Sequence, residues 1–137
     1  MAIEYKERKQ IEEQHLLSLY EDAGWYAYTQ DIQQLQQAVT NSLAVISAWE
    51  GEQLIGLIRG VGDGLTILYI QDILVLNSHK NQGIGTALLD RLTEKYAHVR
   101  QKVLLTEDAP DVRHFYEKNN FASCDQGTLV SFAKLNG

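Results

Sequence analysis

The sequence contains little cysteine and little proline. In 137 residues there is a single cysteine, Cys124, and a single proline. One cysteine cannot close a disulfide within the chain or complete a zinc site, and the four histidines lack the spacing of metal-binding motifs such as H-E-x-x-H. We therefore expect no internal disulfide and no metal, and we expect Cys124 to pack as a small apolar residue.

Positive charge and long apolar runs are also scarce. The 12 lysine and arginine residues are outnumbered by 18 aspartate and glutamate residues, which gives a formal net charge of −6. Without a basic cluster to neutralise phosphates we expect no nucleic-acid partner, whereas cationic or amine-bearing partners fit the acidic balance. No apolar segment approaches the roughly 20 residues that span a bilayer, and residues 1–10 lack the apolar core of a signal peptide. These absences predict a cytoplasmic protein without a membrane partner.

The remaining composition is that of an ordinary globular protein. Hydrophobic residues make up 45% of the chain and charged residues 22%. Both fractions are typical of folded domains, and a chain of this length can bury a core of its own. The sequence therefore predicts one domain over residues 1–137, large enough to be an enzyme.

Periodicity predicts two helices near the start of the chain. Residues 12–23 carry apolar side chains at Leu16, Leu17, Tyr20 and Ala23, which fits the spacing of a helix. Asp31 can cap a second helix, because its carboxylate can accept a hydrogen bond from an N–H group of the first turn. An aromatic connection over residues 24–29 joins the two helices.

Apolar runs between turn residues predict the strands. A hairpin joins the second and third strands, and a glycine-containing turn leads into a long fourth strand. The predicted strands are residues 2–6, 43–49, 54–59, 65–76, 102–106 and 129–134, and the later helices are residues 83–97 and 112–119. Hairpins combined with two crossover helices predict an α+β fold with a mixed, largely antiparallel central sheet and helices on both faces.

A polar segment with two glycines lies between the fourth strand and the following helix. It reads NSHKNQGIGTALL over residues 77–89. The first N–H groups of a helix lack partners within the helix and the helix dipole adds partial positive charge, so this end can hold an anion. Gly83 and Gly85 have no Cβ to obstruct it. The spacing predicts a pyrophosphate on the N–H groups of residues 81–86, and a tight turn without a ligand is the alternative.

Two familiar phosphate loops do not fit this segment. Gly83 and Gly85 would begin a G-x-G-x-x-G motif, but Leu88 stands at the third glycine position. The glycines also lie too far beyond the strand, so a dinucleotide-binding fingerprint is disfavoured. No G-x-x-x-x-G-K-[ST] motif occurs, which excludes a P-loop.

Two short motifs resemble those of the GNAT N-acetyltransferase superfamily. Residues 80–85 read KNQGIG and occupy the positions of the acyl-CoA-binding signature [QR]-x-x-G-x-[GA]. Residues 115–121 read FYEKNNF and match a second signature, a helix containing F-Y followed by [GN]-F. Both motifs occur in the family's order, and the predicted element order resembles the family fold over nearly the whole chain. The resemblance implies an N-acetyltransferase that uses acetyl-CoA.

Three positions depart from the family's usual pattern. Lys80 stands where glutamine or arginine is usual, but backbone N–H groups make most of the pyrophosphate contact, so the resemblance still implies binding. Asn120 replaces a common glycine, which is a mild exchange because asparagine tolerates a left-handed conformation. Ala109 stands where the family often has an asparagine that contacts the cofactor, so that contact is expected to be missing or supplied elsewhere.

The resemblance also implies how the cofactor lies. Acetyl-CoA would occupy a cleft between the fourth strand and the strand at residues 102–106, with its pantetheine amides paired to the main chain of the fourth strand and an N–H group polarising the thioester carbonyl. The acceptor amine would attack the thioester directly in a ternary complex. The implied cofactor-binding residues are Ile73, Leu74, Val75, Lys80, Asn81, Gln82, Gly83, Ile84, Gly85 and Thr86.

Two side chains are candidates for proton transfer. The resemblance places the family's general acid at Tyr116, because a phenol with an ordinary pKa of roughly 10 can protonate a departing thiolate. Helix packing beside Phe115 is the alternative. Asp72 interrupts an apolar strand, and alternation puts it on the same face as Ile70 and Leu74. It is the candidate base for the ammonium proton, and the alternatives are a buried carboxylate satisfied by hydrogen bonds or one brought to the surface by a bulge.

The acceptor is not specified by either motif. Trp25, Tyr26 and Tyr28 lie in the aromatic connection, which lines the acceptor side in similar enzymes, where cation and aryl contacts both fit. Capping of the core is the alternative for these rings. We expect an amine-bearing small molecule or a peptide amino group as acceptor, and the resemblance allows a homodimer. A non-catalytic acyl-CoA-binding sensor or regulatory module is the alternative function.

Overall fold

The structure is a computed structural model that describes residues 2–136. The chain divides into two compact units, Met1–Leu105 and Thr106–Gly137. The first unit contains a sheet with helices packed on it, and the second contains one α-helix and the segment that follows it.

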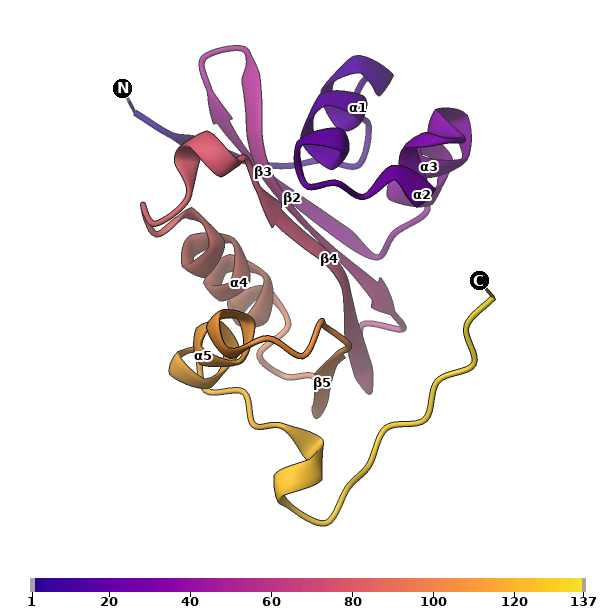
Figure 1. Ribbon diagram of the computed structural model, residues 1–137, viewed down its shortest axis with the longest axis vertical. Coiled ribbons are helices and arrows are strands. Elements are labelled where there is room, and N and C mark those ends of the chain that lie inside the picture. The colour runs from indigo at the N-terminus through magenta and orange to yellow at the C-terminus, as the bar shows by residue number, and fades with distance from the viewer. Residues whose placement is uncertain (1, 137) are drawn as a thin grey trace. The chain divides into compact units, whose positions relative to one another are not determined.

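The first unit is built on a five-stranded sheet whose strands are neighbours in chain order (Figure 1). The first four strands pair antiparallel, and the fifth pairs parallel to the fourth. The strands are β1 (Glu4–Glu7), β2 (Ala44–Glu50), β3 (Gln53–Gly62), β4 (Ile67–Val75) and β5 (Gln101–Leu104). The predicted mixed, largely antiparallel sheet is confirmed.

Helices cover both faces of this sheet (Figure 1). On one face lie α1 (Glu13–Asp22), α2 (Tyr26–Thr29) and α3 (Ile32–Thr40), and on the other lies α4 (Ile84–Lys95). Asp31 caps α3 as predicted, since its Oδ1 accepts a hydrogen bond of 3.1 Å from the N–H of Gln34. The aromatic connection is not a loop throughout, because four of its residues form the single turn of α2.

The buried face of α1 contains two of the apolar residues at the predicted helical spacing, Leu16 and Tyr20. Leu16, Leu19 and Tyr20 are buried, whereas Leu17 is exposed. Positions three and four residues apart share one helix face, so Leu16, Leu19 and Tyr20 can contact the sheet together while Leu17 points about a quarter turn away.

Helix α4 packs closely on the sheet because a glycine lies beneath it. A Cβ at Gly56 in β3 would lie 3.2 Å from Ile84 Cγ2 and 3.3 Å from Leu88 Cδ1. Ile84, Leu88 and Leu92 are buried, and burial of each such side chain stabilises the fold by about 1.5–3 kcal/mol. This packing fixes the start of α4 relative to the end of β4.

A β-bulge in β4 changes which face Asp72 occupies. Arg59 pairs with Asp72 and Gly60 with Ile70, so Gln71 has no opposite residue on β3. Directly opposed residues project to the same face. A Cβ at Gly60 would contact Leu92 of α4, which places Ile70 on the α4 face, whereas Asp72 bonds to a side chain of α1. The prediction that Asp72 shares a face with Ile70 is therefore wrong.

The second unit contains α5 (Pro110–Lys118) and a short 3₁₀ turn, η2 (Cys124–Gln126). The closing strand predicted at residues 129–134 is not formed, and Figure 1 draws this segment as an extended trace. A strand needs a neighbour for its backbone groups, and the described part of this unit offers none. Cys124 is exposed, so the expectation that it packs inside is also wrong.

Residues 2–136 lack two kinds of feature. None of the helices there combines the length and the apolar character needed to cross a membrane. The same residues contain no group of three or more histidine, cysteine, aspartate or glutamate side chains placed to hold a metal ion.

Candidate functional site

The segment before α4 has the backbone geometry of an open turn. The 3₁₀ turn η1 (Asn77–His79) follows β4, and Asn81 and Gly83 then have positive φ values of 65° and 79°. A Cβ at Gly83 would meet no atom within 4 Å, and Lys80 to Gly83 are all exposed. The turn therefore presents its backbone to free space.

The first N–H groups of α4 point into that space without a partner. Gly83 is the N-cap residue and supplies no side chain, and the first helical bond runs from the N–H of Ala87 to the Gly83 carbonyl at 3.0 Å. Within residues 2–136, the N–H groups of Ile84, Gly85 and Thr86 donate to no backbone carbonyl. Three such donors and the positive end of the helix dipole can hold an anion.

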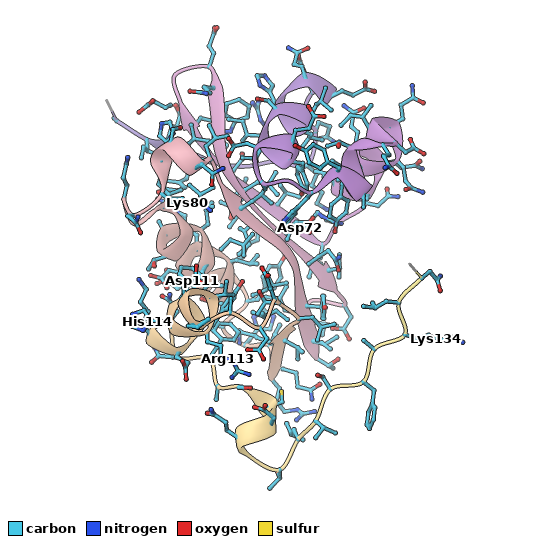
Figure 2. The ribbon with its side chains drawn as sticks, in the orientation of Figure 1. Asp72, Lys80, Asp111, Arg113, His114 and Lys134 are labelled. Carbon is cyan, nitrogen blue, oxygen red and sulfur yellow. The ribbon has the colours of Figure 1, made fainter. Side chains whose placement is uncertain are left out.

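Side-chain hydrogen bonds hold this segment from two sides. The N–H of Asn77 donates to Asp22 Oδ2 at 2.8 Å, and its Nδ2 donates to the Asp22 carbonyl at 3.0 Å, which ties the segment to the end of α1. His79 Nε2 lies 3.1 Å from Glu50 Oε1 beside the β2–β3 turn. The loop that carries Lys80, labelled in Figure 2, is thus held by neighbouring elements.

The far half of β4 has a strand partner on one side. Ile73, Leu74 and Val75 pair with β3, but β5 pairs with β4 only from Ile67 to Ile70. No strand in the described residues lies against the β5 side of residues 71–75. The backbone groups that point to that side can pair with an extended ligand, as an added strand would.

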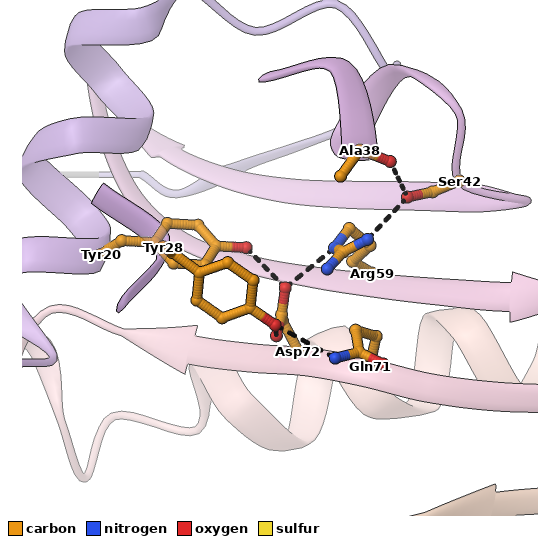
Figure 3. A network of polar contacts seen from close by, with 7 residues as sticks. All are labelled: Tyr20, Tyr28, Ala38, Ser42, Arg59, Gln71 and Asp72. Atoms are coloured by element: carbon orange, nitrogen blue, oxygen red, sulfur yellow. Dashed lines mark hydrogen bonds and ion pairs between the residues drawn. The ribbon is translucent and has the colours of Figure 1, made fainter. Parts of the chain in front are cut away.

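Asp72 lies at the centre of a buried polar network (Figure 3). Its side chain is nearly inaccessible, with a residue exposure of 3%. Oδ2 accepts hydrogen bonds from the Tyr20 hydroxyl at 2.9 Å and from Arg59 Nε at 2.8 Å, and Oδ1 accepts one from the Tyr28 hydroxyl at 2.8 Å. The contacts join α1, α2, β3 and β4.

The network extends to two further side chains. Arg59 Nη1 donates to Ser42 Oγ at 3.4 Å, and Gln71 Nε2 donates to the Tyr28 hydroxyl at 3.1 Å (Figure 3). Burial, reinforced by the Asp72 charge, raises the pKa of the Tyr20 hydroxyl well above its ordinary value, and burial also raises the pKa of Tyr28. Burial would lower the pKa of Arg59, but the Asp72 carboxylate outweighs it and raises that pKa. Both phenols therefore stay protonated and donate.

The hydrogen bonds of Asp72 bear on its predicted role as the base. A carboxylate has about four lone-pair positions, and three of those on Asp72 accept hydrogen bonds from Tyr20, Tyr28 and Arg59. The arrangement matches the alternative interpretation, a buried carboxylate satisfied by hydrogen bonds. A role for Asp72 as a base stays a prediction.

The three aromatic residues of the acceptor hypothesis behave differently. Tyr28 turns inward to Asp72, and its ring lies 5.2 Å from that of Tyr20. Trp25 packs beside both, with ring centroids 5.9 Å from Tyr20 and 6.2 Å from Tyr28, yet remains partly exposed. Tyr26 is 57% exposed. Trp25 and Tyr26 are therefore accessible to a ligand, whereas Tyr28 belongs to the Asp72 network.

Tyr116 lies on α5 in the second unit. Its ring makes edge contacts with Phe115 at 5.1 Å and Phe121 at 5.9 Å between centroids. Burial raises its pKa to about 12. Asn120, which follows the helix, has a φ of 71°, in agreement with the expected left-handed conformation. The nearby labelled side chains Arg113 and His114 in Figure 2 also come from α5.

Sequence reasoning missed four members of the Asp72 network, namely Tyr20, Ser42, Arg59 and Gln71. A signal for Arg59 existed, because one arginine and one aspartate each interrupt an apolar strand, and the two strands were predicted to be antiparallel neighbours. Buried charges are rarely left unpaired, so Arg59 and Asp72 could have been matched. The positions of Ser42 and Gln71 had no such signal.

Comparisons with known proteins identify related chains. The model of the Acetyltransferase (GNAT) family matches residues 8–121. A GNAT family acetyltransferase structure from Streptococcus pneumoniae is similar, with a TM-score of 0.88, 30% identity and coverage of 98% of each chain. A ribosomal-protein-alanine N-acetyltransferase from Brucella melitensis has a TM-score of 0.76 at 18% identity, covering 99% of this chain and 100% of that one. The last likeness shows the fold alone.

Two other relatives differ in what they share with the chain. An aminoglycoside acetyltransferase from a soil metagenomic sample, solved with sisomicin, shares the fold with a TM-score of 0.69 at 14% identity, covering 98% of this chain and 97% of that one. A curated relative from Gibberella zeae, named "Putative acetyltransferase", is 35% identical over 99 residues, or 67% of this chain and 52% of the relative. The chain thus spans about half the length of that relative. Since the family model covers most of the chain, this protein belongs to the GNAT acetyltransferase family.

Proposed function

We propose that the chain is an N-acetyltransferase that uses acetyl-CoA and transfers the acetyl group to a primary amine of a small molecule or peptide. Family membership supports acyl transfer in general. The observation that carries the proposal is the set of unpartnered N–H groups at the start of α4, beside the half of β4 that has no strand on its β5 side. We propose that residues 1–137 work as one domain.

The residues before α4 fit a pyrophosphate. The donors of Ile84, Gly85 and Thr86 can bind its oxygens, and the open space above Gly83 leaves room for close approach. The Lys80 side chain is exposed in the same loop and can add positive charge. These residues lie in a chain with a net charge of −6, so local N–H groups rather than overall charge must favour the anion.

The free side of β4 fits the amide-bearing arm of the coenzyme. Ile73, Leu74 and Val75 can hydrogen-bond an extended chain through their backbone, with no demand on their apolar side chains. When bound, acetyl-CoA supplies an acetyl group activated as a thioester. The backbone of β4 orients that thioester, and an N–H group aimed at its carbonyl oxygen would stabilise the charge that develops there.

We assign Tyr116 the role of donor to the leaving sulfur. Its pKa of about 12 keeps the hydroxyl proton in place throughout the neutral range. Complete transfer to a thiolate whose conjugate thiol has an ordinary pKa near 8.5 would be uphill. The proposed contribution is therefore chiefly a hydrogen bond to the departing sulfur, with solvent able to complete protonation.

We propose that the acceptor amine binds near Trp25 and Tyr26. Their partly exposed rings can contact an alkyl or aryl group and a cation. Asp72 accepts a hydrogen bond from the Tyr28 hydroxyl and so positions the Tyr28 ring, which lies 6.2 Å from that of Trp25. The names of two similar structures, an alanine N-acetyltransferase of ribosomal protein and an aminoglycoside acetyltransferase, guide which amines to test.

The test measures thiol release from acetyl-CoA with a panel of amines that includes arylalkylamines, polyamines, aminoglycosides and peptides with a free N-terminus. We expect release that depends on at least one acceptor and yields its acetyl amide by mass spectrometry. Coenzyme binding without turnover of any acceptor would favour the non-catalytic sensor. Failure to bind the coenzyme would contradict both functions.

A further inference from the structure

Gln71 is an exposed polar residue at the point where β4 loses its second neighbour. β5 pairs with β4 only as far as Ile70, and the bulge leaves Gln71 without an opposite residue on β3. Its side chain still has one defined contact, because Nε2 donates to the Tyr28 hydroxyl at 3.1 Å. The Tyr28 ring lies 6.2 Å from that of Trp25. Gln71 therefore borders the aromatic surface proposed for the acceptor.

The hydrogen bonds of Tyr28 determine which way the Gln71 amide faces. The Tyr28 hydroxyl has one proton and donates it to Asp72 Oδ1 at 2.8 Å. Toward Gln71 the phenol oxygen can therefore only accept, and the NH₂ end of the amide is the end that donates. Figure 3 shows the Gln71 nitrogen turned to Tyr28. The carbonyl end of the amide, Oε1, is left facing away from the network.

The direction of this chain of hydrogen bonds is set by the buried carboxylate. Asp72 faces the Arg59 guanidinium and also accepts from the Tyr20 hydroxyl, so it takes protons from its neighbours and gives none. A flipped Gln71 amide would place two oxygen atoms against each other with no proton between them. Within the part of the first unit that the structure describes, no group donates to Gln71 Oε1. Gln71 thus presents an oriented, unpaired acceptor.

We propose that Gln71 Oε1 accepts a hydrogen bond from the amino group of an arylalkylamine, whose aryl group lies on Trp25 and Tyr26. The inference rests on the proposed acetyl transfer and adds the substrate class. An ammonium group offers N–H donors alone, which an amide oxygen can accept. Trp25 is 36% exposed and Tyr26 57%, so both rings can pack against an aryl group and attract a cation. Gln71 is then a specificity residue, and Tyr28 is the positioning residue behind it.

The test measures binding of the amine, so it does not depend on acetyl transfer. Calorimetry of the full chain in the presence of CoA compares phenethylamine with its N,N,N-trimethyl analogue, which keeps the aryl group and the charge but has no N–H. Gln71→Met keeps the length of the side chain and removes the acceptor. The preference for phenethylamine over the analogue should be about tenfold smaller in this variant than in the wild type, the size expected for one hydrogen bond to a charged group.

Gln37→Met is the matched control, because Gln37 is an exposed glutamine on α3 and the chemical change is identical. It should keep the preference of the wild type. Tyr28→Phe tests the positioning role, since the amide then loses the hydroxyl that orients it. The preference should fall in this variant too, and Gln71→Met added to it should lower the preference little further, because the two residues act as a unit. Circular dichroism checks that the variants fold.

Three results would overturn the proposal. They are no measurable binding of phenethylamine by the wild type, an unchanged preference in Gln71→Met, and an equal change in Gln37→Met. Thiol release with a different amine would then leave acetyl transfer standing without this contact. Conversely, a preference that depends on Gln71, found in a chain that releases no thiol with any amine, would support the contact and contradict the transferase.

Discussion

Two polar regions adjoin β4, and they differ in whether their hydrogen-bonding groups have partners. At the start of α4, N–H groups lie in an exposed turn without backbone acceptors, and two residues adopt positive φ. Around Asp72, the carboxylate is buried and its tyrosine and arginine partners all donate to it. Open groups can bind a ligand, whereas satisfied groups hold elements together. The first region is therefore suited to the coenzyme and the second to keeping α1 and α2 on the sheet.

The largest effect is expected from removing the carboxylate at the centre of the Asp72 network. Asp72→Ala leaves Arg59 buried without its counter-charge, so the free energy of unfolding should fall by about 3–5 kcal/mol, measured by urea denaturation. Lys95→Ala removes an exposed pair with Glu7 and should cost at most about 1 kcal/mol. Equal losses in the two variants would mean that the network does not hold the fold. If Asp72→Ala does not fold, Asp72→Asn keeps one acceptor oxygen and should show the same trend with a smaller loss.

The next effect concerns the proposed donor. Tyr116→Phe removes the hydroxyl and keeps the ring that packs against Phe115 and Phe121. Loss of a hydrogen bond to a charged leaving group should lower the turnover number about 10- to 100-fold, while calorimetry should find the coenzyme affinity unchanged. Unaltered turnover with the best acceptor would remove Tyr116 from this role.

A smaller effect is expected from adding a side chain in the exposed turn before α4. Gly83→Ala places a methyl group in the space proposed for the pyrophosphate and should raise the dissociation constant of CoA about tenfold, or about 1.4 kcal/mol. Gly51→Ala is the matched control, because Gly51 also has a positive φ, 61°, and open surroundings but lies in the β2–β3 turn. Both variants share the backbone strain. Equal CoA affinities in the two variants would show that any loss of binding comes from backbone strain and not from the position of Gly83.

The smallest effect is a dependence of stability on alkaline pH. Because burial raises the folded pKa of Tyr116 to about 12, above the unfolded value of about 10, its stabilising effect is complete below pH 10 and is lost as pH rises through 12. Partial exposure limits this to about 1 kcal/mol. Thermal unfolding from pH 9 to 12 should be flatter for Tyr116→Phe than for the wild type. Parallel curves would contradict the raised pKa.

The sequence predicted the parts of the fold that depend on local patterns. The Asp31 cap, the hairpins and the glycine turn before α4 follow from neighbouring residues, and all are present. Two short motifs were enough to indicate the family, which the comparisons confirm. Local patterning also predicted where along the chain the five strands that form are located.

The parts that failed depend on contacts distant in the sequence. The bulge at Gln71 places Asp72 on the face of the sheet opposite to that of Ile70. The alternation of side chains along a strand does not by itself show where a bulge lies. The pairing of Arg59 with Tyr20 and Tyr28 through Asp72 needs four elements, α1, α2, β3 and β4, brought together. The strand predicted at residues 129–134 had the right composition but found no neighbour in its unit, since a strand is completed by its partner.

The central claim is that the coenzyme binds to the open backbone groups at the end of β4 and the start of α4. It is tested most directly by backbone amide NMR spectra recorded while CoA is added. The largest shifts should fall on Ile73 to Val75 and on Ile84 to Thr86, and amides around Ser42 should move little. Saturable binding that leaves those two stretches unshifted would contradict the account.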